Sequence, residues 1–196
     1  MKKIIFISTL VLTVIIISVH PGFAKKFFNT PYLEKVERTP QIDANTVNTI
    51  ENKTTYKDSV IAITWNPDSN GLHFEITNLS GSDFKIIWTQ CYINDSFNKY
   101  TVIHEDVKYL REMPPTGLSA GEKLEDFLYP SAFVKFEHGG RISTIRYKEI
   151  YKKKLKENEA APDAFTPQTL IATLTLDAGS TRYVYDFHFK TEVLEK

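Results

Sequence analysis

The sequence has a single cysteine, Cys91, and therefore no pair that could form an internal disulfide. It also lacks the Cys-x-x-Cys, His-x-x-x-His and His-Glu-x-x-His spacings that are typical of zinc sites. No Gly-Lys-[Ser/Thr] element of a phosphate-binding loop is present. These absences argue against the commonest metal and nucleotide sites. In an exported protein, the absence of an internal disulfide also means that packing alone must hold the core together.

Neither sign of charge predominates, because 24 lysines and arginines match 24 aspartates and glutamates. Removal of an N-terminal segment that contains Lys2 and Lys3 would leave a slight acidic excess. Overall charge therefore gives no attraction to nucleic acid, and we expect no nucleic-acid partner. The aromatic share of 13% is that of a chain with a packed core rather than of a disordered one.

Residues 1–24 have the organisation of a secretory signal peptide. Lys2 and Lys3 precede the uncharged, apolar run Ile4–Val19, and small residues, Gly22 and Ala24, stand before Lys25. We expect cleavage after Ala24, export, and a periplasmic or extracellular location. The alternative is an uncleaved anchor helix, which would bring membrane contact. Against it, the apolar run is shorter than the roughly 20 residues that a membrane span needs.

The rest of the chain is long enough for one domain. Residues 25–57 show little periodicity and contain Pro31 and Pro40, which is typical of an extended arm or tether. This arm could contribute an edge strand around Asn45–Ile50. We expect the domain itself to occupy residues 58–196.

From residue 59 onward, short runs with the period of a strand alternate with turn residues. In Leu72–Asn78, Leu72, Phe74 and Ile76 alternate with polar residues. The runs that we expect to be strands are Ser59–Trp65, Leu72–Asn78, Phe84–Ile93, Lys99–His104, Lys123–Tyr129, Ala132–Phe136, Thr169–Leu176 and Arg182–Lys190. Strands that follow one another without alternating helices predict an all-β fold, an antiparallel β-sandwich.

One segment, Thr144–Asn158, departs from the strand pattern. Apolar residues recur in it at spacings of three and four among many lysines, so we expect one inserted amphipathic helix near 144–158. Its lysines, Lys148, Lys152, Lys153, Lys154 and Lys156, could touch anionic lipid head groups or an acidic partner. Because acidic residues dilute this charge, we favour a solvated helix packed on the sandwich.

The residues that could carry chemistry are few. After residue 24 the histidines are His73, His104, His138 and His188. Cys91 lies in the apolar run Ile86–Ile93, where a buried, inert thiol is expected, although His104 could face it. His73, His188 and Asp186 could converge on neighbouring strands. None of these combinations has a diagnostic spacing, so we predict no catalytic, cofactor-binding or metal-binding residues.

Two stretches carry a resemblance to a known family. Phe74–Ser80 contains Ile-x-Asn-x-Ser, and Met113–Lys123 places two prolines before Gly121-Glu122 at a strand start. Over residues 58–137 and 168–190 the chain resembles exported bacterial immunoglobulin-like β-sandwich proteins of uncharacterised function. The resemblance implies an immunoglobulin-like sandwich and an extracytoplasmic address, and it supplies no catalytic residues.

Together these features predict an exported, non-enzymatic binding or assembly module of the bacterial cell envelope, whose partner is an envelope protein. Exposed edge strands of the sandwich could accept a strand from that partner. The alternatives are a membrane-anchored sandwich protein that keeps its N-terminal helix, and a hydrolase or metal-dependent enzyme with an unfamiliar site.

Overall fold

The structure is a computed structural model, and it describes residues 26–41, 48–95, 97–104, 113–139, 142–156 and 169–195. The predicted signal peptide, residues 1–24, lies outside the described residues. Within the described part, the only helical segments are two short 3-10 turns, Trp88–Gln90 and Ser131–Phe133. No helix in that part has the length and apolar character needed to cross a membrane.

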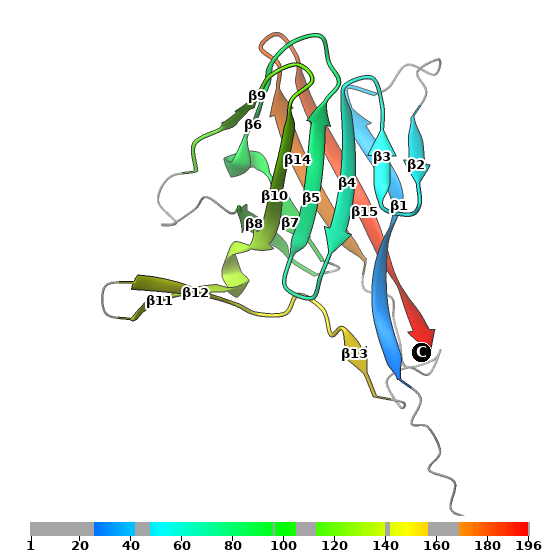
Figure 1. The fold of residues 1–196 in the computed structure, drawn as a ribbon, viewed down its shortest axis with the longest axis vertical. Helices are drawn as coiled ribbons and strands as arrows, with labels where there is room; N and C mark the ends of the chain where they lie inside the picture. The colour runs from blue at the N-terminus through cyan, green and yellow to red at the C-terminus, as the bar shows by residue number, and fades with distance from the viewer. Residues whose placement is uncertain are drawn as a thin grey trace, which may run out of the picture.

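The fold is all-β and antiparallel, and most of its strands form one strongly curled, half-barrel sheet (Figure 1). The order along the sheet is β13 (Lys154–Leu155), β1 (Phe27–Thr39), β15 (Arg182–Glu195), β14 (Leu170–Asp177), β7 (Tyr92–Asn94), β8 (Lys99–Ile103), β10 (Lys123–Pro130), β5 (Leu72–Asn78), β4 (Ile61–Pro67), β3 (Thr55–Lys57) and β2 (Thr49–Glu51). A side branch leaves β14 through β6 (Phe84–Ile86) to β9 (Thr116–Leu118). A separate hairpin, β11 (Val134–Gly139) with β12 (Ile142–Tyr147), projects from the side.

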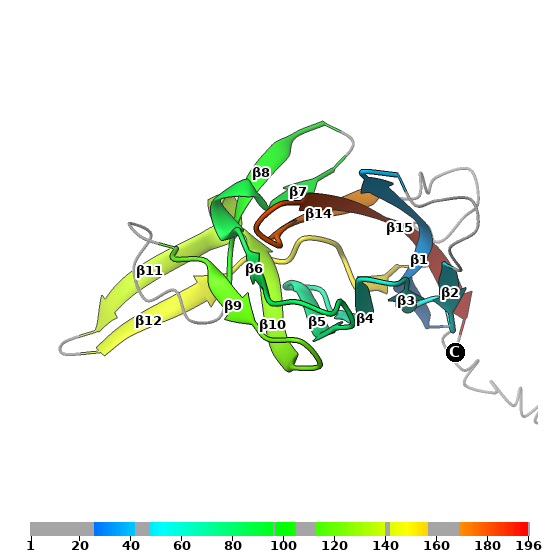
Figure 2. The ribbon, with the colours of Figure 1, turned by 90° about the horizontal axis from the view of Figure 1, so that it is seen from above.

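The curl of the sheet encloses the core. Seen from above, β14 and β15 arch over one side while β10, β5 and β4 form the other (Figure 2). Trp65 of β4 bridges the two sides, because its ring packs against Phe187 and Phe189 of β15 at centroid distances of 5.0 and 5.3 Å. Burying such aromatic rings contributes much of the hydrophobic stabilisation of a domain this size.

The alternating sequence patterns correctly predicted the central strands. In β5, Leu72, Phe74 and Ile76 are buried, and the strand has the bounds expected from its period of two. In β15, Tyr185, Phe187 and Phe189 are buried on one face, as the sequence predicts. The expected sandwich of two separate sheets differs from what is seen, since the strands are hydrogen-bonded along one continuous path.

The sequence predicts an arm over residues 25–57, and the structure places the described part of that segment in the sheet. Phe27–Thr39 form β1, which pairs with β15 from Phe27↔Glu195 to Thr39↔Val184. A β-bulge between Leu33 and Lys35 shifts the alternation, so inward residues do not keep a period of two. This irregularity explains why the strand has no clear periodic signal. Thr49–Glu51 of the same segment form β2, at the end of the sheet path.

The inserted helix predicted over Thr144–Asn158 is wrong. Through Tyr147 the segment belongs to β12, Lys154–Leu155 form β13, and the backbone N–H groups of Lys148 and Ile150 donate to Phe133 and Ser69 instead of to a helical turn. Like charges four residues apart, such as Lys148 and Lys152, also disfavour a helix here. Residues 157 and 158 lie outside the described part.

Two other expected strands are interrupted by 3-10 turns. The run Phe84–Ile93 divides into β6, the turn Trp88–Gln90 and β7, and this turn places the indole of Trp88 in the core. Ala132–Phe136 begins in the turn Ser131–Phe133 and continues into β11. Continuous apolar runs give no signal for such breaks, because buried strands and buried turns are equally apolar.

Candidate functional site

The histidines that were candidates for a shared site lie apart, each with its own acidic partner. His73 Nε2 is 3.3 Å from Asp68 Oδ2, and His188 Nε2 is 3.1 Å from Glu37 Oε2. Asp186 accepts a hydrogen bond from the Thr173 hydroxyl at 2.5 Å. Among the described residues no three His, Cys, Asp or Glu side chains gather as a metal site would require. The side chain of His138 lies outside the described part.

Cys91 is buried and its thiol donates to the carbonyl of Ile87 at 3.4 Å. Burial raises the pKa of the thiol to about 12, so it stays protonated at neutral pH. A protonated, enclosed thiol is a poor nucleophile. The side chain of His104, the proposed partner of Cys91, is hydrogen-bonded to Asp126 instead.

His104 and Asp126 form the most unusual polar pair inside the curl. His104 Nδ1 lies 3.1 Å from Asp126 Oδ2, and the imidazole stacks on Trp88 at a centroid distance of 4.1 Å. Asp126 Oδ1 accepts a hydrogen bond from the backbone N–H of Phe127 at 2.7 Å. Nε2 of His104 is buried without a hydrogen-bond partner in the described part. Because both side chains are more than nine-tenths buried, a substrate cannot reach the ring while the surrounding strands stay closed.

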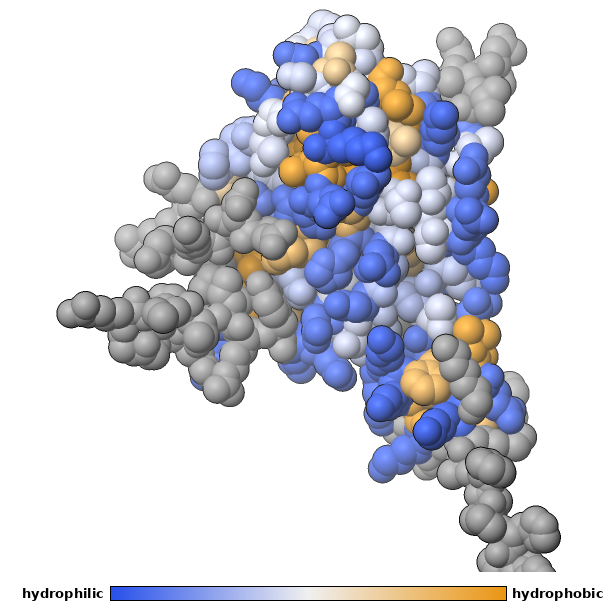
Figure 3. Space-filling view, in the orientation of Figure 1, coloured by the Kyte–Doolittle hydropathy of each residue, from blue (hydrophilic) through white to orange (hydrophobic). Residues whose placement is uncertain are grey.

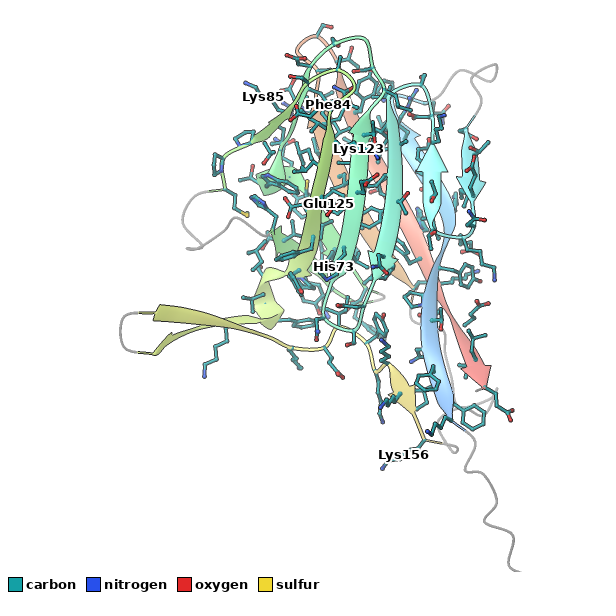
Figure 4. All side chains as sticks on the ribbon, viewed as in Figure 1. His73, Phe84, Lys85, Lys123, Glu125 and Lys156 are labelled. Atoms are coloured by element: carbon teal, nitrogen blue, oxygen red, sulfur yellow. The ribbon has the colours of Figure 1, made fainter. Side chains whose placement is uncertain are left out.

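An accessible hollow of about 690 Å³ lies instead at the upper end of the molecule, over β6, β9 and the β14–β15 turn. The strand register sets Asp177, Lys85 and Gly117 side by side across β14, β6 and β9. Their neighbours Phe84 and Leu118 turn into the core. Gly117 leaves the floor of the hollow open, because a Cβ at this position would meet no atom within 4 Å. We call this region the Gly117 hollow; Figure 4 labels Phe84 and Lys85 beside it.

The free edge of β9 runs along this hollow. The N–H of Ile87 donates to the carbonyl of Thr175 on β14, so the backbone groups of Lys85, two residues earlier, also point toward β14. By the same alternation the backbone N–H and C=O groups of Ile86 and Phe84 point toward β9. Gly117, which stands opposite Lys85, therefore turns its N–H and C=O away from β6, toward an edge that carries no further strand among the described residues.

The position of this edge is fixed by Asn78, a buried residue of the Ile-x-Asn-x-Ser motif. Its amide donates to the carbonyls of Leu118 at 2.9 Å and Ser82 at 3.0 Å. Its side-chain oxygen accepts from the N–H and the hydroxyl of Ser80 at 2.9 and 2.7 Å. One buried side chain thus connects the end of β5, the following turn and the end of β9.

The charged groups of the hollow differ in whether they have a partner among the described residues. Oδ1 of Asp83 accepts from the N–H of Ala120 at 3.2 Å, and Oδ1 of Asp177 accepts from Gly179 at 2.9 Å. The Asp83 carboxylate is thus bound by the β9–β10 turn and the Asp177 carboxylate by its own turn, and Oδ2 of Asp177 also lies 3.6 Å from Arg182 Nη2. The exposed ammonium of Lys85 has no hydrogen-bond or ion-pair partner within the described part of the chain. It is the group available to a ligand.

Sequence reasoning overlooked one motif here. Gly117-Leu118-Ser119-Ala120-Gly121 has the Gly-x-Ser-x-Gly spacing of a nucleophile elbow. In that motif the serine stands on a strained turn between a strand and a helix. Ser119 lies instead between β9 and β10, and its N–H donates to the carboxylate of Glu122 at 2.8 Å. Only Gly121, with φ of +79°, has a left-handed conformation in this turn.

A shallower hollow of about 380 Å³ lies on the outer face of β4, β5 and β10. Glu75 and Glu125 stand directly opposite each other across β5 and β10, and Lys123 Nζ lies 2.9 Å from Glu75. This hydrogen bond raises the pKa of the lysine. Figure 4 shows Lys123, Glu125 and His73 following one another down this face. The face is polar and ion-paired.

Comparison of the chain with protein-family models, with curated proteins and with solved structures gives no match.

Proposed function

We propose that this chain is an exported, non-enzymatic binding or assembly module of the bacterial cell envelope, and that it captures an extended segment of an envelope protein at the Gly117 hollow. The observation that carries the proposal is the edge of β9, which has no further strand among the described residues and where Gly117 presents a backbone donor and acceptor. Export rests on the predicted signal peptide, residues 1–24. The immunoglobulin-like relationship belongs to the same proposal and rests on the resemblance alone.

An extended segment is the ligand that this geometry favours. A strand added at an open edge gains main-chain hydrogen bonds, while the adjacent surface selects its side chains. Each such hydrogen bond contributes only about 0.5–1.5 kcal/mol, so the short edge needs help from side-chain contacts. The hollow over Lys85 and Gly117 can receive a side chain of the added strand.

The charge of the hollow indicates which side chain fits. Asp83 and Asp177 each accept a backbone hydrogen bond, and Asp177 also lies 3.6 Å from Arg182, so Lys85 is the charged group of the hollow that has no partner within the described part of the chain. An acidic side chain or a terminal carboxylate would pair with it. Pro114 and Pro115, just before β9, limit pairing to the Gly117 position and protect the edge from less specific association.

The test is quantitative capture of envelope proteins from the protein's own cells by tagged full-length chain. Gly117→Pro removes the edge N–H, whereas the matched Gly117→Ala keeps it and adds only one methyl group in open space. We expect Gly117→Pro to reduce capture of a reproducible partner at least tenfold, and Gly117→Ala to leave it nearly unchanged. Equal capture by both variants would contradict the proposal.

A second variant tests whether the loss of capture is merely a loss of folding. Lys85→Gln removes the free charge of an exposed side chain without adding a carboxylate opposite Asp177, so it should keep the melting temperature of the parent protein. It should nevertheless lose the same partner that Gly117→Pro loses. A partner that both variants still capture while they remain folded binds elsewhere on the protein.

A further inference from the structure

The lysine-rich segment that lacks the predicted helix meets the start of β1 at the lower end of the molecule. Leu155 and Lys154 pair with Phe27 and Phe28, and the N–H of Asn29 donates to the carbonyl of Lys153 at 2.9 Å. One residue further, this register sets Lys26 beside Lys156. Five exposed lysines are thereby gathered from two distant parts of the sequence, namely Lys26, Lys152, Lys153, Lys154 and Lys156. We call this group the lysine tip.

The side chains of Lys26, Lys153 and Lys154 have no hydrogen-bond or ion-pair partner within the described part of the chain. The described strands bring Glu195, opposite Phe27, to the same end. Glu192 is also near, but its carboxylate lies 3.1 Å from Lys53. Glu157 follows Lys156 in the sequence and lies outside the described part. Like charges on neighbouring strands repel, so a surface that supplies negative charge would stabilise this end.

Apolar side chains stand among these lysines. Phe27, Phe28, Leu155 and Val193 are only partly buried, and Leu194 is 38% exposed. In the space-filling view, apolar atoms lie between hydrophilic ones at the lower end of the molecule (Figure 3). Basic residues interleaved with apolar ones are the composition of surfaces that lie in a membrane interface.

The position of the tip suits a flat surface. The lower ends of β1 and β15 extend beyond β4 and β5, and Lys156 is near the extremity (Figures 1 and 4). The Gly117 hollow lies at the opposite end of the molecule.

We propose that the lysine tip docks on a lipid bilayer whose head groups are anionic. The lysines pair with the head groups while Phe28 and Leu194 enter the interface between them. The neutral overall charge of the chain does not oppose this, because screening confines such attraction to a distance of about 10 Å. The inference concerns a different surface from the Gly117 hollow and stands independently of it.

The test uses the protein as purified from cells that export it, with its N-terminus read by intact mass. Sedimentation is compared with vesicles of phosphatidylcholine alone and of phosphatidylcholine with phosphatidylglycerol. Each lysine near an anionic surface strengthens binding about fivefold. We expect the triple variant Lys26→Gln, Lys153→Gln, Lys154→Gln to bind the phosphatidylglycerol vesicles about a hundredfold more weakly than the parent protein. The matched control is Lys57→Gln, Lys99→Gln, Lys123→Gln, which removes the same charge elsewhere and should bind like the parent.

A second readout works even if residues 1–24 remain attached and bind both kinds of vesicle. A polarity-sensitive dye on Leu194→Cys should shift to the blue with phosphatidylglycerol vesicles, and the triple variant should lose the shift. The same dye on Ser180→Cys, in the exposed turn at the opposite end, should not respond.

Two outcomes would overturn the inference. One is equal loss of binding in the triple variant and its control, or no preference of the Leu194 dye for anionic vesicles. The other is binding of polyglutamate without binding of phosphatidylglycerol vesicles, which would assign the tip to an acidic protein. Either result leaves capture at the Gly117 hollow unaffected, so the two proposals fail separately.

Discussion

Arg38 of β1 donates through Nη1 to Oδ2 of Asp58 at 2.9 Å, and both side chains are buried. The same oxygen accepts from the hydroxyls of Tyr56 and Tyr185 at 3.2 and 3.0 Å. Oδ1 accepts from the N–H groups of Val60 and Ile61 at 2.7 and 2.9 Å. One carboxylate therefore joins β1, β3, β4 and β15. The ion pair of Arg38 with Asp58 thus connects the segment predicted as an arm to the core.

Asp58→Asn should destabilise the fold by about 3 kcal/mol. The change leaves Arg38 buried without its counter-ion, and it replaces one accepting oxygen by a donating amide. Chemical denaturation, with the free energy of unfolding extrapolated to water, measures the loss. The control is Glu125→Gln on the exposed face of β10, which should stay within about 0.5 kcal/mol of the parent.

Gly71→Ala should destabilise the protein by about 1–3 kcal/mol. A Cβ at this position would lie 2.7 Å from Cε1 of Tyr129. That ring cannot move aside freely, because it packs edge-on against Phe127 at 4.2 Å. Thermal melting compares it with Gly81→Ala, whose added methyl group meets no atom within 4 Å. Equal melting temperatures of the two variants would show that the Tyr129 ring moves aside to make room for the methyl group.

Cys91 should not react with a thiol reagent in the native protein at pH 8. Its side chain is buried and burial raises its pKa to about 12, so both access and thiolate are lacking. In denaturant the same thiol should react at once and in full, which serves as the internal control. Rapid native labelling would mean that the turn around Trp88–Gln90 opens readily.

Stability should fall as pH rises from about 9 to 12. Burial raises the pKa of Cys91 from 9.0 to about 12, and burial with the charge of Asp68 raises that of Tyr151 from 10.0 to about 12. Burial and the charge of Asp58 also raise the pKa of Tyr56 and Tyr185. A group whose folded pKa is raised stabilises fully below its unfolded pKa, and this is lost as pH rises through the folded value.

Melting temperatures across this range measure the effect. Tyr151→Phe removes one of the titrating groups, so its decline between pH 10 and 12 should be shallower than that of the parent protein. A parent whose melting temperature is constant from pH 9 to 12 would contradict the assignment of these groups as buried and neutral.

The sequence predicted those strands whose two faces differ. Leu72–Asn78 and Arg182–Lys190 alternate between buried and more exposed residues, and the period of two places them directly. β1 escaped prediction because its bulge next to Leu33 breaks the alternation. The helix was wrongly predicted because Ile150, Tyr151 and Leu155 have helical spacing, although each is held by tertiary contacts that a local pattern does not contain.

The candidate site could be predicted only in part. The loop from Met113 to Lys123 stood out in the sequence through its prolines and glycines. Its pairing with β6, which sets Gly117 beside Lys85, depends on a contact between residues more than thirty positions apart. The lysine tip likewise needs the pairing of β1 with β13. Local sequence patterns do not predict which residues pair over such distances along the chain.

The most direct test of capture is photo-crosslinking in the protein's own cells from a reactive residue placed at position 119, which is exposed, lines the Gly117 hollow and leaves Lys85 in place. We expect one reproducible crosslinked envelope protein, which persists with Gly117→Ala and disappears with Gly117→Pro. The same residue at position 57, exposed on β3, should not give this product. A crosslink at position 119 that Gly117→Pro leaves intact in a folded protein, or none at all, would contradict capture at this edge.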